Sequence, residues 1–175
     1  KELALDKQLG ITALVEVCDN VPNCSIGRKV LKIPYLQVSR KAIPNDLTTI
    51  GIQIKNVFNE NYPTQNIIGY IPGQTDQYIV YTAHYDAMGS YGEGNYCAGA
   101  EDNASGTMMV LDLARQYMKE KKPYYSIAFM LFSGEEAGLK GSNYYVSHPL
   151  FPLSKIKEVI NLDMVMTGQD GVFLF

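Results

Sequence analysis

Five side chains of the kinds that bind metals or move protons stand beside predicted strands and helices. They are His84, Asp102, Glu135, Glu136 and Asp163. The histidine, the glutamate pair and the second aspartate each follow a predicted strand, whereas the first aspartate precedes a predicted helix. Ligands of an open parallel α/β sheet bind beyond the carboxyl ends of its strands. We therefore expect these side chains to meet at one edge of a sheet.

An imidazole together with several carboxylates is a ligand set that suits zinc or a related divalent cation. Clustering this many acids without a cation is electrostatically costly, because like charges disfavour one another's ionised form. Alternate residues of an extended chain point to the same side, so Asp86 is expected to accept the ring N–H that His84 does not use for the metal. The pattern predicts a metal site supported by Asp86.

The adjacent acids Glu135 and Glu136 can divide two tasks, because neighbouring side chains point in different directions. One carboxylate then binds the metal, and the other takes a proton from a water molecule that the metal acidifies toward about pH 7. The pair follows a predicted buried strand, where two acids are hard to explain as packing. This arrangement is typical of metal-assisted hydrolysis.

Each of these residues also has an ordinary structural explanation. A single histidine such as His84 is more often a hydrogen-bonded structural residue, and Asp102 or Asp163 could cap the element that follows it. The two glutamates could be a solvated loop pair. Because all of these residues occur at the ends of predicted elements, the coincidence favours a metal site over several separate explanations.

Hydrophobic periodicity predicts the elements that position these side chains. Apolar residues recur at helical spacing from residue 104 to 119, and Asn103 or Ser105 is placed to cap that helix. The continuous apolar run 126–132 is typical of a strand buried on both faces of a sheet.

Further elements are expected on either side of this pair. A second helix is predicted over 137–147 and a strand over 159–162. Strands at 66–71 and 78–81 are expected to pair as an antiparallel hairpin, because turn-forming residues separate them. Alternation of strands and helices predicts an α/β fold, with a mainly parallel mixed sheet flanked by helices. Before about residue 60, short β-like stretches among Pro and Asn predict a small β-rich region.

Composition limits the classes of function. The 175 residues are 46% hydrophobic and 19% charged, which is typical of a globular protein with a sizeable core. A net charge of -3 with scattered basic residues argues against a nucleic-acid partner. No apolar run approaches the roughly 20 residues that span a bilayer, so no membrane-spanning segment is expected. A disulfide between Cys18 and Cys24, which flank a turn-like segment, stays open.

The motifs around the candidate residues resemble those of the M28 family of zinc peptidases. The matching segments are His84-Tyr-Asp86, Ala100-Glu-Asp102-Asn-Ala-Ser-Gly106, Phe132-Ser-Gly-Glu135-Glu136-Ala-Gly-Leu139-Lys-Gly-Ser142 and Asn161-Leu-Asp163-Met164. Each segment alone is a modest signal, but the four in this order are specific and cover about residues 65–166. The resemblance implies the phosphorylase/hydrolase-like fold of zinc exopeptidases.

By the same resemblance, two zinc ions are expected, bridged by the carboxylate of Asp102. One ion takes His84 and Asp163, the other takes Glu136, and Glu135 is the general base. The peptide bond between Asp102 and the next residue is expected to be cis.

The implied activity is removal of residues from the end of a peptide substrate, with the N-terminal end expected and carboxypeptidase specificity left open. Two alternatives stay open: a glutaminyl cyclase, which is a zinc acyltransferase of the same fold, and a receptor-type module that binds without catalysis. Neither the preferred side chain nor the oligomeric state is predicted.

Residues 1–47 resemble the latter half of a protease-associated domain, which many of these enzymes carry as an insertion, and residues 48–175 are then the peptidase core. The family supplies one more metal-binding histidine downstream of the Asp163 position, and His148 does not match it. The core is therefore expected to be C-terminally incomplete and the chain a fragment of a longer enzyme. Family habit gives an extracytoplasmic location, secreted or periplasmic, as the expectation.

Overall fold

The computed structural model describes residues 10–20, 25–27, 30–55, 57–90 and 94–168. The chain separates into two compact units, Lys1–Tyr62 and Pro63–Phe175. The division lies close to residue 60, where the character of the sequence changes. Cys24 lies outside the described residues, so the question of a disulfide between it and Cys18 stays open.

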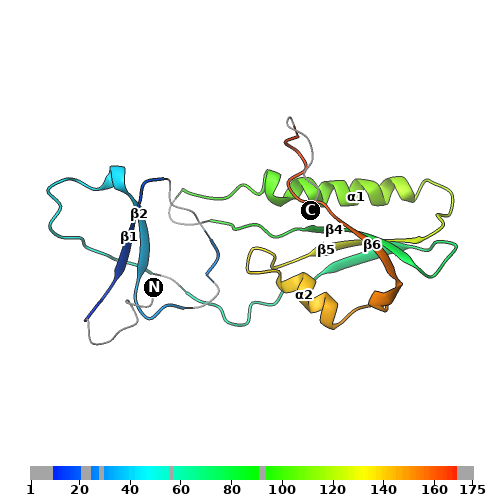
Figure 1. Cartoon of the computed structure of the whole chain (residues 1–175), viewed down its shortest axis with the longest axis horizontal. Helices are drawn as coiled ribbons and strands as arrows, with labels where there is room; N and C mark the ends of the chain where they lie inside the picture. Colours follow the sequence, from blue (N-terminus) through cyan, green and yellow to red (C-terminus); the bar gives the residue numbers. More distant parts are fainter. Residues whose placement is uncertain (1–9, 21–24, 28–29, 56, 91–93, 169–175) are drawn as a thin grey trace. The chain divides into compact units, whose positions relative to one another are not determined.

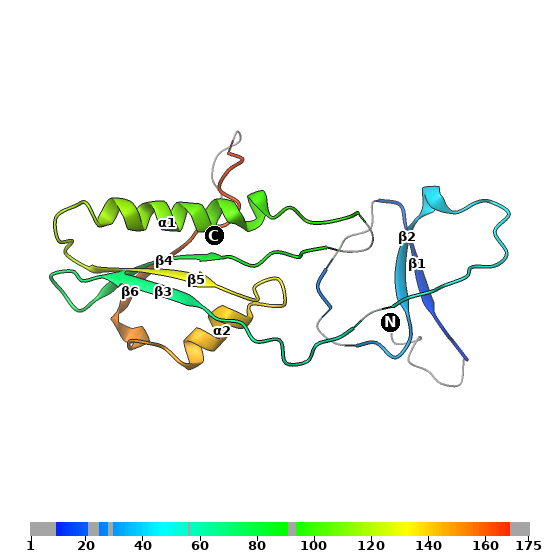
Figure 2. The same ribbon diagram turned by 180° about the vertical axis from the view of Figure 1, so that it is seen from behind.

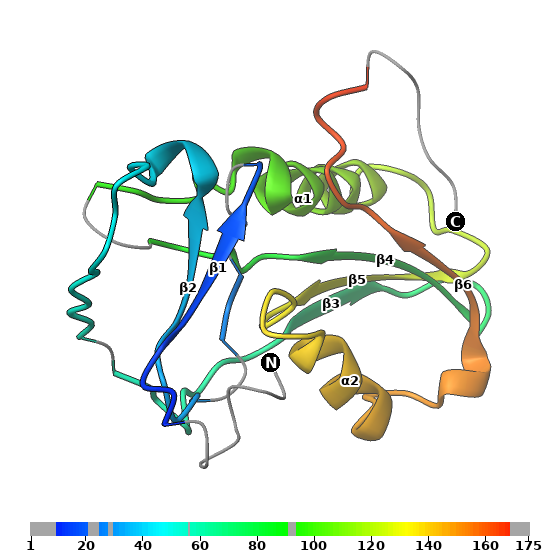
Figure 3. The ribbon, with the colours of Figure 1, turned by 60° about the vertical axis from the view of Figure 1, so that its left-hand side comes forward.

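The first unit contains a small parallel sheet. Strand β1 (Leu14–Cys18) pairs with β2 (Tyr35–Ser39), and a short 3-10 helix follows at Arg40–Ala42. Figure 3 shows the two strands side by side. Just beyond the ends of the two strands, Arg40 and Asp19 form an exposed ion pair at 2.7 Å. It contributes little to stability because solvent screens it. The expected β-rich region is present, whereas its likeness to a protease-associated domain stays a prediction.

The second unit is a four-stranded mixed sheet in the order β3-β5-β4-β6. The strands are β3 (Ile67–Ile71), β4 (Tyr78–His84), β5 (Ser126–Phe132) and β6 (Ile156–Asn161), and the helices are α1 (Gly106–Tyr117) and α2 (Lys140–Ser147). Short helical turns occupy Ala100–Ser105 and Leu153–Lys155. Strands β5 and β6 both run parallel to β4, and only β3 is antiparallel. The predicted α/β fold, with a mainly parallel mixed sheet flanked by helices, is confirmed.

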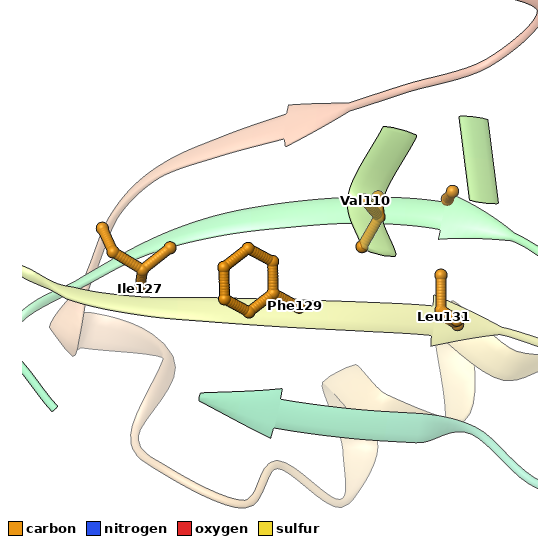
Figure 4. Packing of buried hydrophobic residues seen from close by; sticks show 5 residues of the cluster. Val110, Ile127, Phe129 and Leu131 are labelled. Atoms are coloured by element: carbon orange, nitrogen blue, oxygen red, sulfur yellow. The ribbon is translucent and has the colours of Figure 1, made fainter. Parts of the chain in front are cut away.

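The two helices cover opposite faces of this sheet, as Figures 1 and 2 show from the two sides. On one face, Val110 of α1 packs against Ile127, Phe129 and Leu131 of β5 (Figure 4). On the other face, Tyr145 of α2 packs with residues that include Met130. Successive side chains of a strand point to opposite faces, so both faces of β5 are apolar. This explains the continuous apolar run in the sequence.

The predicted hairpin between β3 and β4 is wrong, because β5 lies between them and pairs with both. The most apolar strand occupies a central position, where both of its faces are buried. The connection from β3 to β4 passes the start of β5, and Gly73 N–H donates to Ser126 Oγ there at 2.9 Å. A Cβ on Gly73 would lie 2.3 Å from the backbone of Tyr125, so the crossing requires glycine.

Both helices are shorter than predicted. Helix α2 begins at Lys140 instead of residue 137, because Gly138 and Leu139 have positive φ angles that a helix cannot include. Helix α1 begins at Gly106, and the Oδ1 atom of Asn103 accepts its N–H at 2.9 Å. Within the described part of the chain, no helix has the length and apolarity needed to cross a membrane.

Core packing predicts the effect of shortening a methionine. Met130 is 1% exposed, so Met130→Ala should lower the free energy of unfolding by about 2–5 kcal/mol, because it removes buried surface and leaves a cavity. Met108→Ala is the matched control, since that side chain on α1 is 62% exposed and should cost less than about 1 kcal/mol. Urea denaturation of the full chain measures both. Equal losses would contradict the packing described.

Candidate metal centre

Three of the predicted ligands come together at the carboxyl edge of the sheet. One ligand atom from each of His84, Asp102 and Asp163 lies within 4.8 Å of the other two. The Nε2 atom of His84 is 3.0 Å from Oδ1 of Asp102 and 3.6 Å from Oδ1 of Asp163. The histidine side chain is 4% exposed, whereas the two aspartates are about half exposed. One nitrogen and two carboxylate oxygens thus face a common point that solvent can reach.

The parallel pairing of β4 with β6 places two of these ligands. His84 is the last residue of β4, and Asp163 stands just beyond the end of β6. The Leu162 N–H continues the ladder by donating to the Thr82 carbonyl at 2.8 Å. Because both strands run in the same direction, their ends deliver the two side chains to one edge.

Asp102 reaches the same edge from the irregular turn before α1. Its φ and ψ of −110° and 95° are not helical, and its peptide bond to Asn103 is cis, as the resemblance implies. Thr107, in the first turn of α1, donates from Oγ1 to the His84 carbonyl at 2.9 Å. The start of α1 is therefore tied to the end of β4, beside the ligands.

Glu135 borders the three-residue cluster, with its Oε2 atom 4.0 Å from Nε2 of His84. Glu136, the predicted fourth ligand, is not a member of the cluster that the described residues form. Burial raises the pKa of Glu136, and the charges of Asp102 and Glu135 raise it further. The negative charges of the cluster thus act on the Glu136 carboxylate, although it lies outside the cluster. Its role as a ligand stays a prediction.

Asp86 supports the site through different atoms from those expected. The His84 Nδ1 atom lies 3.0 Å from the main-chain carbonyl oxygen of Asp86, and 3.7 Å from the nearer carboxylate oxygen. The predicted bond from the ring to the carboxylate is therefore wrong. The carboxylate instead accepts the N–H groups of Glu135 at 3.1 Å and of Glu136 at 3.2 Å. Asp86 thus connects the histidine with the glutamate pair.

The electrostatics of the cluster favour a bound cation or bound protons. Burial lowers the pKa of His84, but the neighbouring Asp163 carboxylate and weaker contributions outweigh it, so the pKa is raised above 6.5. Burial also raises the pKa of the Asp163 carboxyl, and Asp102 adds to this effect while His84 opposes it. A divalent cation would relieve the same repulsion, and this donor set suits zinc.

A cavity of about 440 Å³ has His84, Glu135 and Asp163 at its polar end and apolar residues of β4, β5, β6 and α2 along its walls. His148 lies elsewhere, exposed and stacked on Tyr144 with ring centroids 4.3 Å apart. This exposed position agrees with the sequence analysis, in which His148 does not match the family's metal-binding histidine.

Two polar residues, Glu101 and Asn103, connect the turn before α1 to the segment around Asp163, and the sequence did not predict this role. Glu101 accepts the backbone N–H groups of Met166 and Thr167 through Oε1, each at 3.2 Å. Asn103, considered only as a helix cap, bonds to the backbone on both sides of Asp163. Their bonding partners are some 60 residues away in the sequence, so local spacing does not reveal these bonds. The signal that the sequence offers is that both residues are neighbours of Asp102.

Comparison with known proteins places this geometry in context. The model of peptidase family M28 matches residues 66–175. Aminopeptidase YwaD of Bacillus subtilis (strain 168) is 41% identical over 112 residues, which cover 62% of this chain and 23% of that protein. Leucine aminopeptidase 1 of Trichophyton rubrum is 32% identical over 113 residues, covering 61% of this chain and 30% of that protein. The chain thus spans about a quarter to a third of these curated relatives.

Solved structures show the same fold. A leucine aminopeptidase precursor from Bacteroides thetaiotaomicron VPI-5482 is similar with a TM-score of 0.51 and 28% identity, over 62% of this chain and 44% of that one. A Zn-dependent exopeptidase from Parabacteroides distasonis ATCC 8503 has a TM-score of 0.50 and 23% identity, over 57% of this chain and 41% of that one.

Proton binding at the cluster predicts how the metal-free protein responds to pH. The raised pKa of His84 contributes stability below about 6.5, and this stability is lost as the pH rises through the higher folded value. The raised pKa values of Asp163 and Glu136 act in the same direction from about pH 4 upward, because the folded chain retains protons that the unfolded chain has released. The thermal midpoint measured with a chelator should therefore fall from pH 5 to pH 8.

Excess zinc should reverse that trend, because the metal and protons compete for the same ligands. His84→Gln is the control, and it should flatten the metal-free profile between pH 6 and 8. A metal-free midpoint that rises with pH over this range would contradict the electrostatics described.

Proposed function

The chain belongs to peptidase family M28, and from this premise we propose that it carries the metal centre of a zinc-dependent exopeptidase that removes N-terminal residues from peptides. The observation that carries the proposal is the convergence of His84, Asp102 and Asp163 within 4.8 Å, with Glu135 beside them. The names of the relatives support the same class, since they are aminopeptidases. Family membership favours hydrolysis over acyl transfer or binding alone.

The ligand roles follow from the positions of the side chains. The Nε2 atom of His84 and a carboxylate oxygen of Asp163 would hold one zinc ion, and Asp102 offers a second carboxylate oxygen that can bridge to another. Glu136 is the candidate ligand for that second ion. Bound zinc supplies Lewis acidity toward a water molecule and toward the carbonyl of the scissile peptide bond.

Glu135 is the proposed general base. Its carboxylate lies at the border of the ligand cluster, 4.0 Å from the imidazole, where it can take a proton from the attacking water and pass it to the leaving amine. It is also distinct from the three clustered ligands, so its carboxylate is free for proton transfer. The bond from its backbone N–H to Asp86 fixes the turn that carries it.

Removing the basic carboxylate tests this role. Glu135→Gln in the complete protein should lower kcat for an aminoacyl p-nitroanilide by about 10²–10⁴-fold, because the amide cannot accept the proton. Zinc content should stay at the wild-type level, since the side chain is not a clustered ligand. The matched control is Glu120→Gln, which changes an exposed glutamate after α1 and should leave kcat unchanged. Full turnover by the Glu135 variant would refute the assignment.

The supporting role of Asp86 has its own test. Asp86→Asn keeps a carbonyl oxygen for one of the two backbone N–H groups but presents an amide N–H₂ to the other, so the turn of Glu135 and Glu136 should loosen. We expect kcat to fall about 10–100-fold, the range for changed supporting partners of metal sites. Asp112→Asn, on the exposed face of α1, is the control. Unchanged kcat in the Asp86 variant would show that the two bonds have no role in catalysis.

Metal removal tests the centre as a whole. Dialysis against a chelator should abolish hydrolysis, and addition of zinc should restore it. Atomic emission of the restored protein measures the number of ions per chain. Hydrolysis that persists in the fully metal-free protein would overturn the proposed function.

A further inference from the structure

Asn103 is the most deeply buried polar side chain near the metal centre, at 2% exposure. Its amide makes three hydrogen bonds to backbone. Nδ2 donates to the Leu162 carbonyl at 2.9 Å, and Oδ1 accepts the N–H groups of Gly106 at 2.9 Å and Met164 at 3.3 Å. Leu162 and Met164 are the two neighbours of Asp163, and Asn103 itself follows Asp102 directly. One side chain therefore connects the backbones that carry two of the clustered aspartates.

The contacts of this side chain require an amide. A single group must donate toward the Leu162 carbonyl and accept from two N–H groups, and among side chains of this size only an amide offers both functions without taking up a proton. An aspartate would present a second acceptor to the Leu162 carbonyl. Burial increases the cost of such a mismatch, because no water replaces the lost bond.

The surrounding backbone is packed too closely to shift freely. A Cβ on Gly106 would lie 2.1 Å from the Leu162 carbonyl oxygen and 2.5 Å from Oδ1 of Asn103, so the start of α1 is pressed against the segment before Asp163. Met164 has a φ of 52°, which residues other than glycine rarely adopt, and its N–H is one of the two that Asn103 accepts. The amide thus helps to hold an uncommon backbone conformation directly after a candidate ligand.

We propose that Asn103 is a positioning residue that sets the separation of the Asp102 and Asp163 carboxylates and thereby determines how tightly zinc binds between them. The proposal rests on the zinc site of the proposed function. Asn103 touches neither metal nor substrate in this role, and it acts only through the two aspartates. Like charges at this edge push the carboxylates apart, and the buried bonds of Asn103 oppose that movement.

Glu101 also connects the turn before α1 to the segment after β6, but at residues farther from Asp163. Its bonds to Met166 and Thr167 are exposed and lie three and four residues beyond Asp163. Those of Asn103 to the same segment go to the two residues adjacent to Asp163, and the side chain that makes them is 2% exposed. Loss of the Asn103 bonds should therefore move the Asp163 carboxylate more than loss of the Glu101 bonds would.

The test compares Asn103→Asp and Asn103→Ser with the wild type in the complete protein. Asn103→Asp preserves the shape and removes the donor, and Asn103→Ser shortens the side chain. The zinc dissociation constant is measured by competition with a chromogenic chelator, and the visible absorption of the Co²⁺-substituted protein reports ligand geometry. Both variants should bind zinc at least about tenfold more weakly, in the range for changed supporting partners of metal sites, and their Co²⁺ bands should shift.

Ser126→Ala is the matched control for general loss of stability. Ser126 is 5% exposed and makes two backbone bonds, accepting from Gly73 at 2.9 Å and donating to Thr75 at 3.1 Å, but it lies at the opposite end of β5. This variant should lower the thermal midpoint of the metal-free protein while leaving zinc affinity and the Co²⁺ spectrum unchanged.

The outcomes separate this proposal from the one it rests on. Wild-type protein that fails to bind zinc would defeat the proposed function itself. Tight zinc binding by the wild type and equally tight binding by both Asn103 variants would overturn only the positioning role. The role is also overturned if Ser126→Ala weakens zinc binding as much, or if neither Asn103 variant folds in the presence of zinc, because Asn103 would then serve folding in general.

Discussion

Mutual repulsion of carboxylates around one buried imidazole is the constraint on which the organisation of the second unit depends. Asp102 and Asp163 share the neighbourhood of His84, and Glu135 stands 4.0 Å from the same ring nitrogen. Burial raises the pKa of Asp163, and the charge of Asp102 adds to this effect, so the ionised carboxylate is disfavoured where no cation is bound. Such a cluster persists in a folded chain only where other bonds hold its members in place.

Those bonds run mainly from side chains to backbone. Asp86 holds the N–H groups of the glutamate pair, Thr107 holds the carbonyl of His84, and Asn103 holds the segment around Asp163. Each is a polar residue next to, or close to, a candidate ligand in the sequence. The residues that make these bonds thus lie beside the candidate ligands in the sequence, and the bonds connect strands β4, β5 and β6 with the start of α1.

The sheet makes this connection possible through the position of β5. Because β5 is apolar on both faces, it lies inside the sheet, and α1 and α2 cover it from opposite sides. The antiparallel strand β3 pairs along its outer edge, so β4 and β6 are left to run parallel with it and end at the same edge. A hairpin between β3 and β4 would have occupied one of the two edges of β4, so β5 and β6 could not both have paired with it.

The sequence by itself determined which residues could do chemistry and which elements carry them. Apolar periodicity located α1 and β5, and the histidine and acids beside the ends of predicted elements identified the three clustered candidate ligands, because both signals depend on local spacing along the chain. Tertiary structure alone decided the strand order, the atoms of Asp86 that support the site, and the buried bonds of Asn103. These depend on partners about 50 to 60 residues away, such as Glu135 for Asp86 and Leu162 for Asn103. Local spacing carries no information about such partners, so only the folded chain reveals them.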